Sequence, residues 1–174
     1  AIPNREVRNI FTEQILKMFQ EAAGRDGEAL GAFCNALEYG RAGEVERRLT
    51  GYLEKTISIR DTFARKPTKE NFYHGILLGI LGFKDGWTVS SNREAGDGFS
   101  DIMIQTENME RAILIEVKYA EDNLDAVCQK ALKQIEEKRY GERMHQDGVR
   151  CILKYGIACS RKHCRVLLKE ETMG

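Results

Sequence analysis

The sequence predicts a mixed α/β fold in which helices flank a sheet and a further helical region precedes them. Three features lead to this prediction. Apolar residues recur at three-to-four spacing through the first third of the chain, apolar runs of strand length follow position 86, and one amphipathic segment divides those runs into two groups. A chain of 174 residues is long enough to bury a hydrophobic core.

The first third of the chain is expected to be helical throughout. None of its apolar stripes carries a pattern that indicates chemistry, so we interpret this part as a scaffold or as a docking surface for something upstream. Arg65 to Thr68 forms the expected boundary, with Thr68 as the cap of the next helix. The first helix is expected between a cap at Asn4 and a break at 24–27, with its apolar stripe at 10–19. The next two are expected at about 29–37 and 43–53.

After position 67 the sequence predicts a helix, three strands, a second helix and two more strands. The first of these helices is apolar on most sides, which predicts that it lies buried between other elements. A polar turn at 107–110 separates the second and third strands, so we expect them to form a hairpin. The expected helices are 69–81 and 123–139, and the strands are 87–91, 100–105, 112–119, 149–158 and 165–168.

The charge of the chain gives no overall argument for a nucleic-acid partner. Lys plus Arg and Asp plus Glu both total 27, whereas phosphate binding needs local positive charge. A modest excess of basic residues occurs only near the C-terminal side. These residues are Arg150, Lys154, Arg161, Lys162, Arg165 and Lys169.

Five scattered cysteines without a CxxC pair argue against a disulfide framework and for a reducing compartment. Cys159, His163 and Cys164 fit no common zinc spacing, so we interpret the cysteines as small core residues. The sequence contains no apolar run long enough to span a bilayer and no signal-peptide pattern. We therefore expect a cytoplasmic protein without a membrane partner.

One strand carries charge where an apolar core is expected. In the segment 112–118, Ile113, Ile115 and Val117 should point to one side of the sheet because side chains alternate along a strand. Glu116 and Lys118 should then share the other side. Burying charge is costly unless it is paired or bound to a metal, so this pair is a candidate functional site.

The preceding strand supplies a third candidate. Asp101 stands at the start of the apolar strand 100–105, and the expected hairpin would bring it near Glu116 and Lys118. Two converging carboxylates repel each other unless a divalent cation lies between them, and oxygen ligands suit Mg²⁺ or Mn²⁺. A neighbouring lysine can orient water or stabilise charge on phosphorus, as phosphodiester hydrolysis requires.

An alternative interpretation treats the glutamate and lysine as an exposed pair at a sheet edge. In that case Asp101 would only cap a turn. For the ExK triplet alone this alternative is favoured, because charged triplets are common. The placed aspartate, the hairpin and the buried preceding helix reverse that preference.

Asp101 followed by Glu116-Val117-Lys118 resembles the D…(D/E)xK motif of the PD-(D/E)XK nuclease superfamily. The order of helix, three strands, helix and strand is also similar to its core, so the resemblance implies a restriction-endonuclease-like fold for residues 67–174. Ser100 stands where the superfamily's name has proline, and Phe99 stands where an arginine is often found.

Several segments are more specifically similar to one family of this superfamily. Its members usually carry the nuclease-like domain behind an AAA-ATPase-like domain. The resemblance therefore implies the C-terminal part of a longer protein, with residues 1–66 as a linker to, or part of, an upstream domain. The similar segments are 2–7, 56–62, 70–75, 96–102, 115–118 and 131–135.

The resemblance also implies roles for individual residues. Asp101 and Glu116 would hold Mg²⁺ or Mn²⁺, together with Glu70 on the first core helix, and Lys118 would be the catalytic lysine. His74 lies four residues after Glu70 and hence on the same helical face. It would contact phosphate or Glu70, and a purely structural bond to Glu70 is an equal alternative.

Two further residues are implied on the second core helix and after it. Gln134 and Tyr140 resemble the glutamine and tyrosine that exonuclease-type members carry there, and both would contact substrate. Gln134 borders the apolar stripe of its helix, which favours a structural role for it.

Three functions compete on this evidence. The first is metal-dependent hydrolysis of DNA, rather than RNA, phosphodiester bonds. The second is a catalytically silent module that binds nucleic acid or protein, although Asp101, Glu116 and Lys118 are all present. The third is an enzyme acting on another phosphoester or on a small molecule, which the neutral charge leaves open. The sequence lacks a GxxxxGK[ST] motif, so it has no Walker-type ATPase site.

Overall fold

The computed structural model describes residues 27–56, 66–82, 84–93, 99–108, 110–138 and 144–172. Several features of the sequence analysis lie outside these residues, among them the expected helix with its apolar stripe at 10–19, positions 57–62 of the similar segment 56–62, and Tyr140. The elements are α2 (Gly27–Glu38), α3 (Ala42–Thr56), α4 (Lys66–Leu81), β1 (Thr88–Arg93), β2 (Phe99–Gln105), β3 (Arg111–Tyr119), α5 (Leu124–Glu137), β4 (Cys151–Ser160) and β5 (His163–Thr172).

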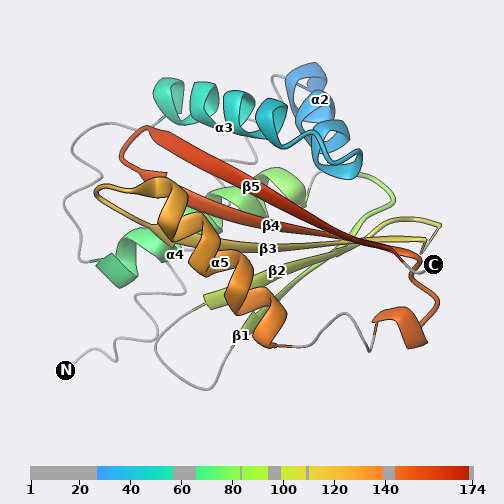
Figure 1. Cartoon of the computed structure of the whole chain (residues 1–174). Coiled ribbons are helices and arrows are strands. Elements are labelled where there is room, and N and C mark those ends of the chain that lie inside the picture. The colour runs from blue at the N-terminus through green and yellow to red at the C-terminus, as the bar shows by residue number, and fades with distance from the viewer. Residues whose placement is uncertain are drawn as a thin grey trace, which may run out of the picture.

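The strands form one five-stranded mixed sheet in the order β1-β2-β3-β4-β5 (Figure 1). Strands β1, β2 and β3 form an antiparallel meander, β3 and β4 are parallel, and β4 and β5 form a hairpin. The parallel step needs a crossover, which α5 supplies between β3 and β4. The predicted α/β fold, with a mixed sheet flanked by helices, is confirmed.

The two sides of β3 pack against different helices. Ile113, Ile115 and Val117 belong to the larger core, which also contains buried residues of α2, α3 and α4. Ala112 and Leu114 belong to a smaller core that includes Ile135 of α5. The alternation predicted for this strand therefore holds, and Glu116 follows Leu114 on the side covered by α5.

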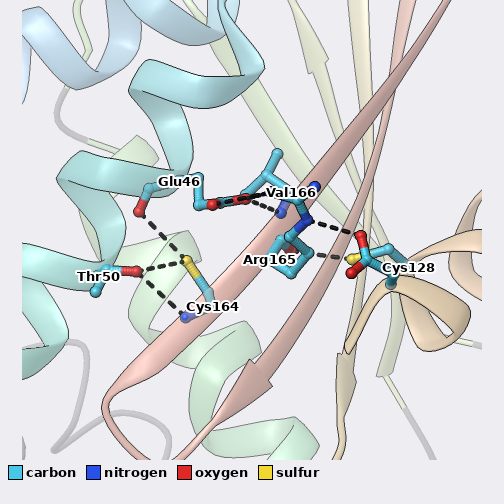
Figure 2. Close-up of polar contacts among 7 residues, drawn as sticks. Glu46, Thr50, Cys128, Cys164, Arg165 and Val166 are labelled. Atoms are coloured by element: carbon cyan, nitrogen blue, oxygen red, sulfur yellow. Dashed lines mark hydrogen bonds and ion pairs between the residues drawn. The ribbon is translucent and has the colours of Figure 1, made fainter. Parts of the chain in front are cut away.

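Helix α3 covers the outer edge of β5, the last strand of the sheet (Figure 1). The backbone N–H of Val166 donates to Glu46 Oε2 at 2.9 Å, and that of Cys164 donates to Thr50 Oγ1 at 3.3 Å (Figure 2). Exposed edge N–H groups invite pairing with another strand. Side chains of α3 therefore satisfy the edge and attach residues 42–56 to the sheet.

Most elements differ from the predicted bounds by a few residues, and α4 and β5 show the physical reasons. Helix α4 begins at Lys66, before the expected cap at Thr68, because proline is tolerated in the first turn of a helix. Strand β5 extends to Thr172, well beyond the expected end at 168. Its last residues are polar and partly exposed, so this half of an edge strand has no apolar run to predict it. Within the described residues, we find no helix with the length and apolarity needed to cross a bilayer.

Candidate active site

The hairpin register aligns the predicted acids. Strand β2 pairs antiparallel with β3, and Asp101 is the direct backbone partner of Glu116. Side chains of directly opposed residues in such a pair are near neighbours. The Asp101 side chain lies outside the described part of the structure. For this residue the structure therefore establishes the backbone pairing with Glu116.

Glu116 is a fully buried carboxylate with two lysines beside it. Its exposed fraction is 0 %. Lys118 Nζ lies 2.6 Å from Glu116 Oε1, and Lys138 Nζ lies 3.9 Å from Oε2. The two lysine side chains are only 24 % and 13 % exposed. The alternative of an exposed pair at a sheet edge is therefore wrong for Glu116, since β3 is the central strand.

Lys138 is the member of this group that sequence reasoning missed. It is the C-terminal cap of α5, and its position four residues after Gln134 places both residues on one helical face. This four-residue spacing from Gln134 is the feature of the sequence that could have identified Lys138. Its contact with Glu116 depends on how closely α5 lies on the sheet, which no local pattern specifies. We call Glu116, Lys118 and Lys138 the site cluster.

A glycine permits the close approach of α5. A Cβ at Gly156 of β4 would lie 2.4 Å from the backbone oxygen of Cys128 in α5 and 3.2 Å from Leu132 N. Gly156 is also the parallel-strand partner of Glu116. The absence of a side chain at this position therefore lets α5 lie against the strand next to the site cluster.

Glu70 and its neighbour Lys69 bind the end of β3. Glu70 Oε1 accepts a hydrogen bond from the backbone N–H of Tyr119 at 3.2 Å. Lys69 Nζ donates to the Tyr119 hydroxyl at 3.0 Å. These bonds attach α4 to the residue that follows Lys118. They place Glu70, the predicted third acid, in contact with the residue that follows the predicted catalytic lysine.

His74 is buried in the interface between α4 and the sheet. Its exposed fraction is 3 %, and its Nε2 lies 3.2 Å from Ser91 Oγ on β1. This hydrogen bond links α4 to β1. It is a structural contact to Ser91, whereas the structural bond predicted for His74 was to Glu70. Gln134 is half-buried on α5, beside the fully buried Ile135. Its helical face, shared with Lys138, is the one directed toward Glu116.

A divalent cation fits the donor atoms that the fold aligns. Carboxylate oxygens are the ligands that Mg²⁺ and Mn²⁺ prefer, and the buried Glu116 lies opposite Asp101 in the hairpin. Among the side chains that the structure describes, no group of three His, Cys, Asp or Glu residues is placed to hold a metal. Asp101 is the predicted ligand whose side chain lies outside the described part of the structure.

The five cysteines are free thiols, and four of them are buried. Burial raises the pKa of the Cys34 and Cys128 thiols to about 11, so both stay protonated and unreactive near neutral pH. Burial likewise raises the pKa of Cys159 well above its ordinary value. The interpretation of the cysteines as core residues agrees with these positions.

Three of the six basic residues near the C-terminal side have carboxylate partners within the fold. Lys154 donates to Glu171, Arg165 binds Asp125 and Glu46, and Lys169 donates to Glu136. Their charges are thus offset by neighbouring carboxylates, which reduces the excess of basic charge seen in the sequence. Pairing of this kind was invisible in the sequence because the acids come from α3, α5 and β5.

A second acid with two basic neighbours lies on the same side of the sheet. Glu171 Oε1 lies 3.0 Å from His145 Nε2, and its Oε2 accepts from Lys154. The hydrogen bond from Lys154 is the main cause that lowers the pKa of Glu171, with a further contribution from His145. The Glu171 side chain is 38 % exposed. We call these three residues the edge cluster.

Together, the mixed sheet, its flanking helices and the acid pair aligned across the β2–β3 hairpin define a restriction-endonuclease-like fold with a carboxylate–lysine site. Residues 68–169, more than half of the chain, match the family model described as the PD-(D/E)XK nuclease superfamily, and the chain belongs to that superfamily. No curated protein matches the chain.

Proposed function

We propose that this protein is a metal-dependent nuclease that hydrolyses DNA phosphodiester bonds. The observation that carries the proposal is the buried Glu116 carboxylate, aligned with Asp101 and bound to Lys118 on the central strand. Membership of a nuclease superfamily supports it. A structural ion pair alone gives no reason to align a second acid with a fully buried one.

Asp101 and Glu116 would hold Mg²⁺ or Mn²⁺, with Glu70 as a third acid from α4. The cation supplies Lewis-acid activation of water and neutralises charge during phosphodiester hydrolysis. Because one oxygen of Glu70 accepts from Tyr119 N, Glu70 also fixes the end of the strand that carries the site.

Lys118 would act on the substrate. Its ammonium is anchored at Glu116 and its side chain is 24 % exposed, so it lies between the buried acid and the surface. From there it can donate to a phosphate oxygen or orient the attacking water. Gln134 and Tyr140 would contact the nucleic acid, Gln134 from the helical face that carries Lys138.

The test is cleavage of single-stranded, duplex and branched DNA with Mn²⁺, combined with calorimetric measurement of Mn²⁺ binding. In Asp101→Ala we expect both Mn²⁺ binding and cleavage to be lost. In Lys118→Met we expect cleavage to fall by at least about a hundredfold while Mn²⁺ still binds. Lys133→Met, at a lysine that is 77 % exposed on α5, is the control and should behave as wild type.

Unchanged Mn²⁺ binding in both Asp101→Ala and Glu116→Ala would end the metal-site proposal. Wild type that binds DNA with Mn²⁺ but cleaves none of the three substrates would favour the catalytically silent module instead. Full cleavage by Lys118→Met would remove this lysine from the mechanism.

The protein would work in the cytoplasm, downstream of an ATPase-like domain. The resemblance of residues 2–7 and 56–62 to the family that carries such a domain supports this context, and the free thiols agree with a reducing compartment. Residues 1–66 would connect to that domain or belong to it, with α3 attached to the sheet edge. Nucleotide binding by the full-length protein tests the context.

A further inference from the structure

Lys138 is a second cation at Glu116, contributed by a different element from Lys118. Lys118 comes from the same strand as Glu116, whereas Lys138 caps α5. The two lysines contact different oxygens, at 2.6 Å for Lys118 and 3.9 Å for Lys138. Both oxygens are closed to solvent. The carboxylate is therefore held from two directions.

The number of charges explains why one acid has two lysines. A buried carboxylate needs a partner cation, but one ammonium already neutralises it. Two ammoniums match two carboxylates, which are Glu116 and the opposed Asp101. Counted without Glu70, whose Oε1 accepts from the Tyr119 backbone N–H, these four groups carry no net charge in the absence of a metal. A divalent cation bound at the same oxygens would add two positive charges close to the ammoniums and would repel them.

We propose that Lys138 is a positioning residue that neutralises Glu116 when no metal is bound and is displaced from it when a divalent cation binds. This inference rests on the proposed metal-dependent function. Lys138, rather than Lys118, is the one displaced because its contact is longer and because it is the C-cap that follows the last residue of α5. Lys138 thereby sets how tightly the site holds its metal.

The inference is tested with Lys138→Met, which keeps the aliphatic stem and removes the charge. Calorimetry with MnCl₂ should give binding about tenfold tighter than wild type, because a competing positive charge is gone. Without metal, in EDTA, the melting temperature should fall. A loss caused only by damaged packing would weaken metal binding, so the opposite directions of the two changes are diagnostic. Lys133→Met is the matched lysine control and should change neither quantity.

A double-mutant comparison in EDTA separates this inference from the proposed function. Lys138→Met should lower the melting temperature less in a Glu116→Gln background than in wild type, because the charge it neutralises is absent there. Equal losses in both backgrounds would overturn the inference, as would Mn²⁺ binding by Lys138→Met that equals or falls below wild type. Wild type that binds no Mn²⁺ would contradict the proposed function, and the EDTA comparison alone would then decide whether Lys138 neutralises Glu116.

Discussion

The site cluster and the edge cluster contain the same chemistry in two different settings. Each has one glutamate with two basic neighbours, and both lie on the side of the sheet covered by α5. Glu116 is fully buried on the central strand, whereas the side chain of Glu171 is 38 % exposed on the last strand. Pairing of an acid with lysine therefore does not distinguish a structural cluster from a functional one.

The residue across the hairpin distinguishes them. Glu116 has an acid, Asp101, as its direct strand partner, whereas Glu171 has Ile152. Two opposed acids lower each other's tendency to ionise unless a cation joins them, so they are costly to keep without a function. Glu171 needs no metal, because each of its two oxygens already has a basic partner, His145 or Lys154. The second carboxylate is thus the feature that marks the site cluster.

The largest effect should come from removing one acid from each cluster. Glu116→Gln should reduce DNA cleavage with Mn²⁺ by at least about a hundredfold, because a neutral amide is a poor ligand for a divalent cation. Glu171→Gln should leave cleavage at the wild-type level and lower the melting temperature. Equal cleavage losses in the two variants would mean that the comparison fails and that both clusters serve one purpose.

The next effect concerns the packing that brings Lys138 to Glu116. Gly156→Ala would place a methyl group 2.4 Å from the backbone oxygen of Cys128, so α5 must move or the strand must distort. We expect a loss of roughly 3 kcal/mol in the free energy of unfolding, measured by urea titration. Ala158→Gly, two residues along β4, is a control that removes a buried methyl group without adding one. In a Gly156→Ala background, Lys138→Met should lower the melting temperature less than it does in wild type. In the Ala158→Gly background the effect of Lys138→Met should be the same as in wild type.

The smallest effect should be seen in the pH dependence of stability. The pKa of Glu171 is lowered in the folded protein, chiefly by the hydrogen bond from Lys154. Its contribution is therefore present above the pKa of an unfolded glutamate, about 4.3, and is lost as the pH falls through the folded pKa. In Glu171→Gln, the fall of the melting temperature below that pH should be shallower than in wild type. Identical slopes in the two proteins would mean that the edge cluster adds no stability.

The sequence by itself determined the order of the elements after position 67, the β2–β3 hairpin and the shared side of Glu116 and Lys118. These properties follow from short-range periodicity and from turn chemistry, which act within a few residues of each other. The motif of Asp101, Glu116 and Lys118 could likewise be read from the sequence, because the hairpin converts a spacing along the chain into a register.

Only the tertiary structure decided what surrounds those residues. Lys138 reaches Glu116 because α5 lies closely on Gly156, and Glu46 satisfies the edge of β5 from a helix 120 residues earlier in the chain. The basic residues Lys154, Arg165 and Lys169 have acidic partners from other elements. Such contacts depend on the distance between packed elements, and neither composition nor periodicity encodes that distance locally.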